Sequence, residues 1–429
     1  MKYFLTLTEN PGSFLTAGFV TGNLISIGAY TFSHPNRSQE TPVTTETAFE
    51  QQLTEWRHAL HRCPETGFEE KQTSDFVARV LADLGLEVHR GIGGTGLVAS
   101  LTVGTGKGVI GLRADMDALN IHESVADRPH ASQTPGKMHA CGHDGHMSMV
   151  LGAARLLCER RDFSGTVRFI FQPAEEHGRG AKAMMSDGLF ERFPVDEIYG
   201  AHNMPGIPAG HIATRVGGIM GSEDNFVIRI KGRGTHAARP HMGIDPIVIA
   251  AEIILALQTV VSRSLDPSVP AVVSCTEVFT DGIRNAIPTH VTIKGDTRSY
   301  TPDVQATLER RMREMCEGIS RTHGAECTFE YTHEFAPTVN WEQCVSVAVQ
   351  AAQNVVGAKR VNANIAPLMI SEDFGAFLQK IPGAFVFIGN GDQGQGSTPL
   401  HNATYDFNDD VLPVGARYFA EIARVRLPA

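Results

Sequence analysis

GVIGLRADM (residues 108–116) and TVRFIFQPAEE (166–176) are apolar runs that end in polar residues, and a segment with the length and period of a helix, HMSMVLGAARLLCER (146–160), lies between them. A strand, a helix and a second strand in this order are typical of a parallel sheet. Functional side chains of such sheets gather where the strands end. These segments therefore predict an α/β fold with a site at the carboxyl ends of its strands.

The rest of the chain first extends this pattern and then interrupts it. Helical periodicity at 46–62 and 73–86 precedes the sheet, and the α/β pattern resumes with an apolar run at 385–391 and a helix at 411–425. Between these parts the order β-α-β-β-α-β is that of a ferredoxin-like unit. Its predicted elements are strands at 225–234, 271–279, 290–299 and 326–335 and helices at 244–263 and 303–320.

We therefore predict two domains, as the length of 429 residues also suggests. The catalytic α/β domain is made of two segments, 45–216 and 326–429. The inserted α+β domain occupies 217–325.

Composition excludes several classes of protein. The formal net charge of -10 disfavours a nucleic-acid partner, because phosphate binding needs clustered lysine and arginine. Seven cysteines without a framework spacing favour a reducing compartment, and we expect a cytoplasmic protein.

Residues 1–44 are predicted to be an extension of the folded part. No Asp, Glu, Lys or Arg occurs from Asn10 to Ser33, and the run at 14–32 approaches the length of a membrane span, although glycines and Asn23 dilute it. The extension is read either as disordered or as a signal or anchor. Only the second reading gives an exported or membrane-anchored protein.

MHACGHDGHM (138–147) concentrates residues that bind metals or perform catalysis. Three chemistries fit it: a nucleophilic cysteine with a histidine base, a structural zinc clip, and one wall of a catalytic metal site. Cys141 and His143 are two apart, which suits a turn that enters a helix, and sulfur with imidazole suits zinc or a similar ion. A structural clip is disfavoured because the sequence has no second Cys/His pair of matching spacing.

Residues further along the chain supply the other groups that a hydrolytic metal site needs. Glu175 and Glu176 follow an apolar strand, so that one can bind metal while its neighbour reaches a metal-activated water. His202 follows a short apolar run, and His401 lies in a loop before the last helix.

Several motifs in one order make the chain resemble the M20 peptidase superfamily, in the aminoacylase and hippurate-hydrolase branch that includes plant indole-acetyl-amino-acid hydrolases. They run from about residue 48 to the C-terminus and are LRADMDAL (112–119), MHACGHDGH (138–146), FQPAEEHGRGA (171–181), GAHNMPGIPAG (200–210), GRGTHAARPHMGIDP (232–246), RNAIP (284–288), SEDFGAFLQ (371–379), FVFIGNG (385–391) and LHNATYDFND (400–409). The resemblance implies a phosphorylase/hydrolase-like catalytic domain of the zinc-peptidase type and a ferredoxin-like dimerisation (lid) domain.

The same resemblance implies the activity and the residues that carry it. The expected reaction is hydrolysis of the amide bond of N-acyl amino acids by a homodimer or dimer-based oligomer. Each subunit is expected to hold two divalent ions, Mn²⁺ or Zn²⁺ with Co²⁺ and Ni²⁺ as alternatives. The implied metal ligands are Cys141, His143, Glu176, His202 and His401.

Further roles come from the same resemblance. Glu175 is the implied general base and later proton donor, and Asp117 the carboxylate that orients His143. His236 is expected to reach the substrate carbonyl in the neighbouring subunit, Asn285 to contact the scissile amide, and Arg298 to bind the substrate carboxylate.

Three other functions stay open at this point. A dipeptidase or carboxypeptidase of the same superfamily would use the same site. A cysteine enzyme would use Cys141 as nucleophile and His143 as base, but would leave Glu175, His202 and His401 without a role. A binding or carrier protein that has lost catalysis would not need Glu175.

Overall fold

The computed structural model describes residues 45–125, 127–394 and 396–429. The predicted N-terminal extension, with the apolar run at 14–32, lies outside the described residues.

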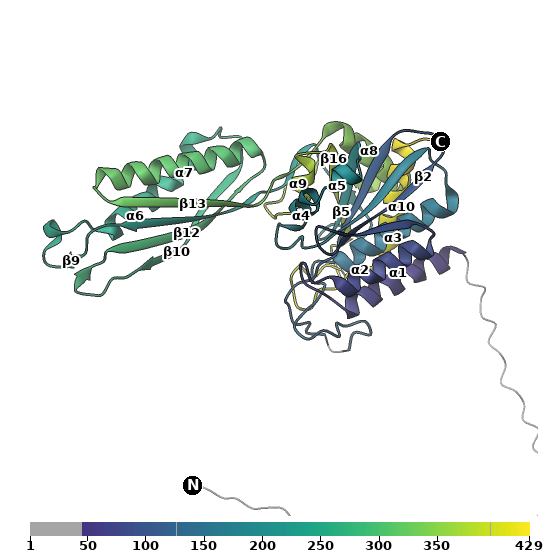
Figure 1. Ribbon diagram of the computed structural model, residues 1–429, viewed down its shortest axis with the longest axis horizontal. Helices are drawn as coiled ribbons and strands as arrows, with labels where there is room; N and C mark the ends of the chain where they lie inside the picture. Colours follow the sequence, from purple (N-terminus) through teal and green to yellow (C-terminus); the bar gives the residue numbers. More distant parts are fainter. Residues whose placement is uncertain (1–44, 126, 395) are drawn as a thin grey trace, which may run out of the picture. The chain divides into compact units, whose positions relative to one another are not determined.

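An eight-stranded sheet forms the centre of the first domain (Figure 1). Its four central strands β4, β3, β5 and β16 are parallel, so their carboxyl ends lie at one edge. The order is β1 (Glu87–Ile92), β2 (Gly96–Val103), β4 (Gly165–Gln172), β3 (Val109–Asp115), β5 (Glu197–Pro205), β16 (Gly383–Gly391), β6 (Ile212–Ala213) and β15 (Val361–Asn362). This edge is where the site residues collect.

Both faces of this sheet are covered by helices, because side chains that alternate along each strand are buried on both sides. Phe169 and Val386 face one core, while their neighbours Ile170 and Phe385 face the other. The first core is covered by α1 (Thr45–Arg62), α2 (Lys71–Asp83), α3 (His143–Arg160), α8 (Glu342–Val356) and α10 (Leu412–Arg426). The second core is covered by α4 (Gly180–Ser186), α5 (Leu189–Arg192) and α9 (Phe374–Leu378).

A separate four-stranded antiparallel sheet has the order β10-β12-β8-β13. Its strands are β8 (Glu223–Lys231), β10 (Ala271–Thr280), β12 (His290–Ser299) and β13 (Glu326–Phe335), and its helices are α6 (Pro246–Thr259) and α7 (Pro302–Thr322). Ile228, Ile253 and Met312 belong to the buried core between this sheet and these helices. The connectivity β8-α6-β10-β12-α7-β13 confirms the ferredoxin-like unit.

Shorter elements complete the fold. A two-stranded ladder joins β9 (Thr235–His236) to β11 (Ala286–Ile287), and a second joins β7 (Gly217–Met220) to β14 (Thr338–Asn340). Single turns of 3₁₀-helix occur at Pro240–Met242, Ala358–Arg360 and Asp409–Val411.

The predicted boundaries of the inserted domain, 217–325, are wrong at both ends. β13 begins at Glu326 but pairs with β8 along most of its length, so it belongs to the inserted sheet. At the other end, β7 pairs with β14 rather than with the four-stranded sheet. The inserted sheet therefore extends from Glu223 to Phe335.

One helical segment in the described part of the chain, Pro246–Ser264, is long and apolar enough to cross a membrane by length and composition. Its inner face packs into the core of the four-stranded sheet through Ile249, Ile253 and Leu257. Its outer face carries Val248 and Leu255, which are exposed.

Candidate metal centre

Sharp turns place Cys141 and the two glutamates at the edge where the parallel strands end. Gly142 has φ of 91°, and a Cβ added there would lie 2.4 Å from Asn203 Oδ1, so only glycine allows the chain to turn between Cys141 and His143. His143 is the first residue of α3. After β4, Ala174 takes the left-handed conformation, with φ of 49°, and directs Glu175 and Glu176 toward the same edge.

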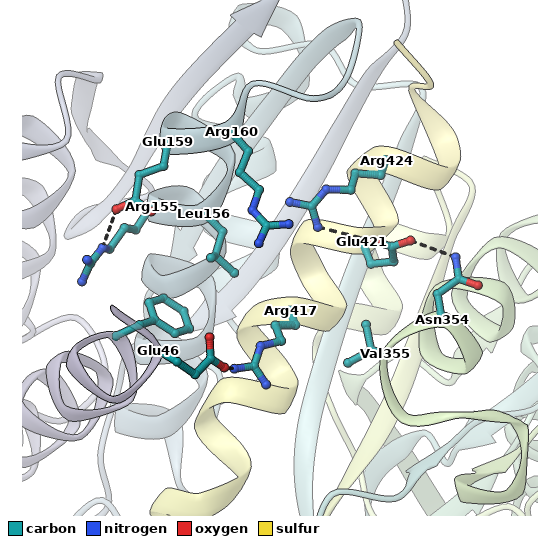
Figure 2. Close-up of a pocket in the computed structure, with 11 residues that line it drawn as sticks. Glu46, Arg155, Leu156, Glu159, Arg160, Asn354, Val355, Arg417, Glu421 and Arg424 are labelled. Carbon is teal, nitrogen blue, oxygen red and sulfur yellow. Dashed lines mark hydrogen bonds and ion pairs between the residues drawn. The ribbon is translucent and has the colours of Figure 1, made fainter. Parts of the chain in front are cut away.

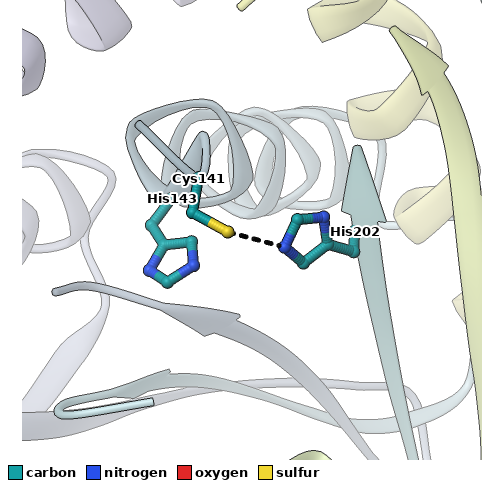
Figure 3. Close-up of side chains that lie close together, drawn as sticks. All are labelled: Cys141, His143 and His202. Atoms are coloured by element: carbon teal, nitrogen blue, oxygen red, sulfur yellow. Dashed lines mark hydrogen bonds between the residues drawn. The ribbon is translucent and has the colours of Figure 1, made fainter. Parts of the chain in front are cut away.

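The structure brings Cys141, His143 and His202 together (Figure 3). Their ligand atoms lie within 4.8 Å of one another, and Cys141 Sγ is 3.3 Å from His202 Nε2. His202 comes from β5, and its Nδ1 lies 2.6 Å from the carbonyl oxygen of Asn203. That contact fixes the ring and leaves Nε2 facing the sulfur.

Cys141, Glu176 and His401 form a second group with the same spacing. His401 Nε2 is 3.5 Å from Glu176 Oε2. Because Cys141 is common to both groups, its sulfur lies where it could bridge two ions. All five predicted ligands are thus placed in two sets of three.

The donors fit a pair of divalent ions. Within the described part of the chain, His143 Nε2 and Glu176 Oε1 are buried but make no hydrogen bond. Buried polar atoms are rarely left unpaired unless an ion or water binds them. Sulfur, imidazole and carboxylate are the ligands that zinc and similar first-row ions accept.

The charge of the cluster also fits cations. Burial and the carboxylates of Glu372, Glu176 and Asp373 raise the pKa of Glu175 well above its usual range. Burial disfavours the charged form of His143, but Asp115 and Asp117 outweigh this and raise its pKa to about 10. Without an ion, the cluster can reduce its negative charge only by holding protons on such groups.

Asp117 lies beside His143 and the turn that carries Glu175 and Glu176. Its Oδ1 is 3.4 Å from His143 Nδ1 and accepts the backbone N–H of Glu175, while Oδ2 accepts that of Glu176. One buried carboxylate therefore fixes both the ring of a candidate ligand and the turn that carries the two glutamates.

Several residues of the site were missed by the sequence analysis. Asp115, at the end of β3, contacts His146 Nδ1 at 2.7 Å, and His146 Nε2 lies 2.7 Å from Asn203 Oδ1. Both nitrogens of His146 are thus engaged, so it orients its neighbours and is not free to bind an ion. Arg113, fully buried, donates to Asp115, Glu372 and Asp373. Arg113 and Asp115 lie in the RADMDAL motif, and Glu372 and Asp373 lie in the SEDF motif, so membership of these motifs was the sequence signal for all four.

A cavity of about 560 Å³ is lined by Glu175 and by four of the candidate ligands, Cys141, Glu176, His202 and His401. Arg298 lines it together with Glu223 and Ser371. Its apolar wall consists of Met220, Phe335, Met369, Ile370 and Leu400.

His236 and Asn285 lie elsewhere. They are neighbours at the β9–β11 ladder, where the backbone N–H of Ala237 donates to the carbonyl of Asn285, and both side chains are exposed. Neither lines the cavity of its own subunit.

A second cavity of about 480 Å³ lies among α1, α3, α8 and α10 (Figure 2). Each glutamate that lines it pairs with an arginine, as in the pairs Glu159–Arg155 and Glu421–Arg424. No histidine or cysteine is among the described residues that line it, so we assign the hydrolytic chemistry to the first cavity.

Comparison with known proteins identifies the family. The model of peptidase family M20/M25/M40 matches residues 111–425. The chain belongs to this family. Hippurate hydrolase of Campylobacter jejuni is 39% identical over 367 residues, which cover 86% of this chain and 94% of the relative. N-acetylcysteine deacetylase of Bacillus subtilis is 37% identical over 384 residues, which cover 89% of this chain and 98% of the relative.

A solved M20 structure also matches. The YXEP protein of Bacillus subtilis, a dinuclear metal-binding peptidase, superimposes with a TM-score of 0.77 at 34% identity, over 89% of this chain and 99% of that protein. The predicted M20 resemblance, in its aminoacylase and hippurate-hydrolase branch, is therefore confirmed. The α/β fold class and the assignment to hydrolases of amide bonds are confirmed at the level of the family.

Proposed function

We propose that this M20 protein is a metal-dependent amidohydrolase that cleaves N-acyl amino acids into a carboxylic acid and a free amino acid. One observation carries the proposal: two sets of three ligand atoms share Cys141, and four of these five residues line one cavity together with Glu175. The names of the two curated relatives support the substrate class, since hippurate and N-acetylcysteine are both N-acyl amino acids.

Cys141, His143 and His202 would hold one divalent ion, and Cys141, Glu176 and His401 the other. When bound, such ions lower the pKa of a water and polarise an amide carbonyl. First-row ions share these ligand preferences, and Mn²⁺ or Zn²⁺ is our proposal for the pair.

Glu175 carries the proton transfers. It takes a proton from the attacking water and passes it to the amide nitrogen, so that the amine leaves as a neutral group. Its position supports both steps, because it is buried, borders the cavity and has no role in either ligand set.

We propose that Arg298 receives the α-carboxylate of the substrate, since a guanidinium suits a carboxylate and Arg298 borders the cavity. The apolar wall of the same cavity would receive the acyl group.

We propose that the protein is a homodimer in which His236 completes the site of the partner. Exposed apolar side chains on the inserted domain support an interface there: Ile247, Val248 and Leu255 on α6, Val272, Val278 and Phe279 on β10, and Ile283. Large exposed apolar patches of this kind mark interaction surfaces.

Mixed dimers test the role of His236. Glu175→Ala and His236→Ala are each expected to be inactive alone. If His236 acts in the partner, random mixing of the two should restore about a quarter of wild-type activity, because half of the dimers then have one complete site. Mixtures that stay inactive, although subunits exchange, would show that His236 acts in its own subunit, and an active His236→Ala protein would show that His236 has no role.

The central experiment measures amine release from a panel of N-acyl amino acids. Chelation should abolish turnover, and added Mn²⁺ or Zn²⁺ should restore it. Glu175→Ala should keep both metals and the fold but lose nearly all turnover, whereas Glu176→Ala should lose metal as well. Substantial turnover by Glu175→Ala, or turnover that resists chelation but not thiol alkylation, would favour a cysteine enzyme.

We also propose a cytoplasmic location. All seven cysteines are free thiols in the structure, which suits a reducing compartment.

A further inference from the structure

The cavity beside the candidate metal centre contains a charged group that the proposed reaction does not use. Glu223, the first residue of β8, lines the cavity with Arg298 and Ser371. Glu223 Oε2 is 2.9 Å from Arg298 Nη1 and accepts a hydrogen bond of 2.8 Å from Ser371 Oγ. A carboxylate therefore already lies against the guanidinium that is proposed to receive the substrate.

A second carboxylate holds the same arginine. Asp296 contacts Arg298 Nε at 3.1 Å, and it does not line the cavity. Arg298 therefore lies between two acids, and the three side chains together carry one net negative charge. A substrate with a single carboxylate would gain little at such a site, because Glu223 repels it at the distance where Arg298 attracts it.

The unused atoms of this group suggest what the substrate offers. Within the described residues, Glu223 Oε1 has no hydrogen-bond donor and Arg298 Nη2 has no acceptor. Both side chains are about a quarter exposed, at 27% and 22%, and both face the cavity. One free acceptor beside one free donor is the complement of a ligand that carries a cation beside its carboxylate.

We propose that Glu223 is a specificity-determining residue, and that the substrates are N-acyl derivatives of basic amino acids, such as lysine, arginine or ornithine. The α-carboxylate binds Arg298, and the side-chain cation binds Glu223. Ser371 holds Glu223 in place from the catalytic domain. This inference rests on the proposed amidohydrolase function and names its substrate class.

The test compares three substrates that share one acyl group: Nα-acetyllysine, Nα-acetylnorleucine and Nα-acetylglutamate. Norleucine lacks only the ammonium group of lysine, so the ratio of their kcat/KM values isolates the charge. The metal-loaded wild type should prefer lysine to norleucine about tenfold, the effect of one charge-assisted contact. It should use glutamate least.

Glu223→Gln keeps the shape of the side chain and one acceptor oxygen but removes its charge. It should bring the lysine-to-norleucine ratio close to one and improve turnover of the glutamate substrate. Asp296→Asn is the matched control, because it also removes a charge from Arg298 but does not face the cavity. It should change KM for all three substrates alike and keep the preference for lysine.

Binding provides a readout that does not depend on turnover. The Glu175→Ala protein, loaded with metal, should bind Nα-acetyllysine about tenfold more tightly than Nα-acetylnorleucine by calorimetry. Equal affinity, or equal kcat/KM, for Nα-acetyllysine and Nα-acetylnorleucine overturns the inference but not the proposed amidohydrolase function. A lysine-to-norleucine ratio that is the same in Glu223→Gln and in the wild type has the same meaning. If the protein hydrolyses no member of a wider panel of N-acyl amino acids but still binds Nα-acetyllysine preferentially, the proposed function is overturned instead.

Discussion

The replacement Asp117→Asn tests whether one carboxylate organises the metal centre. Its two oxygens accept the backbone N–H groups of Glu175 at 3.0 Å and Glu176 at 3.1 Å, and Oδ1 faces His143 Nδ1. Asparagine has the same shape but only one acceptor oxygen, so its amide nitrogen must point toward one of the two N–H groups. A hydrogen bond to a charged group contributes about 1.5–3 kcal/mol, and at least one is lost.

The lost hydrogen bond weakens the positioning of the turn that carries Glu176 or of the His143 ring, and both residues are candidate ligands. Since about 1.4 kcal/mol corresponds to a tenfold change in affinity, the metal dissociation constant should rise about 10- to 100-fold. Calorimetric titration of the metal-free protein measures that constant, and turnover at saturating metal shows how far activity recovers. Asp83→Asn, an exposed position at the end of α2, is the control and should bind metal normally. Wild-type affinity and wild-type turnover in Asp117→Asn would refute the role of Asp117.

Three further predictions concern stability. Arg113→Met leaves the buried carboxylates of Asp115, Glu372 and Asp373 without the cation that neutralises them. The free energy of unfolding measured in urea should fall by about 3–5 kcal/mol, and a fall of less than about 1 kcal/mol would contradict this. Gly145→Ala should lower the melting temperature, because its Cβ would lie 2.2 Å from the Phe407 ring, a clash that costs about 1–3 kcal/mol. Burial opposes the charging of His61, but Asp144 at 2.8 Å outweighs it and raises the pKa of His61. The stabilisation from the His61–Asp144 pair should be complete below about pH 6.5 and be lost as the pH rises through the raised pKa of His61. The difference in unfolding free energy between wild type and His61→Gln, measured by urea titration, should therefore become smaller at alkaline pH. A difference that does not vary with pH would contradict it.

The sequence was sufficient for the parts of the fold that depend on local pattern. The apolar runs that became β3, β4 and β16 are buried on both faces, so they read as continuous apolar segments and were predicted within a few residues. The strand at 326–335 was predicted as the last strand of the ferredoxin-like unit, but the predicted boundary at 325 left it outside the inserted domain. The pairing of β13 with β8 shows that it belongs to the inserted sheet.

The site shows a similar limit. Residue types identified Cys141 and the histidines as candidates, but His143 and His146 are three apart and therefore share one face of α3. The packing of α3 against β3 and β5 decides that His146 lies between Asp115 and Asn203 while His143 faces the glutamates. Glu223 had no motif to mark it. Its importance follows from its contact with Arg298, which comes from another strand.

The position of β16 in the central sheet has a consequence for how the protein folds during synthesis. β16 lies between β5 and β6, although more than half of the chain separates it from β3, and His401 follows it. The ribosome therefore completes the whole inserted domain, whose strands are contiguous in sequence, before the main sheet can receive its last central strand. Until then the edges of β5 and β6 are unpaired, which is the condition under which partly folded chains aggregate or recruit chaperones. The final segment of the chain thus closes the sheet and completes the metal centre in the same step.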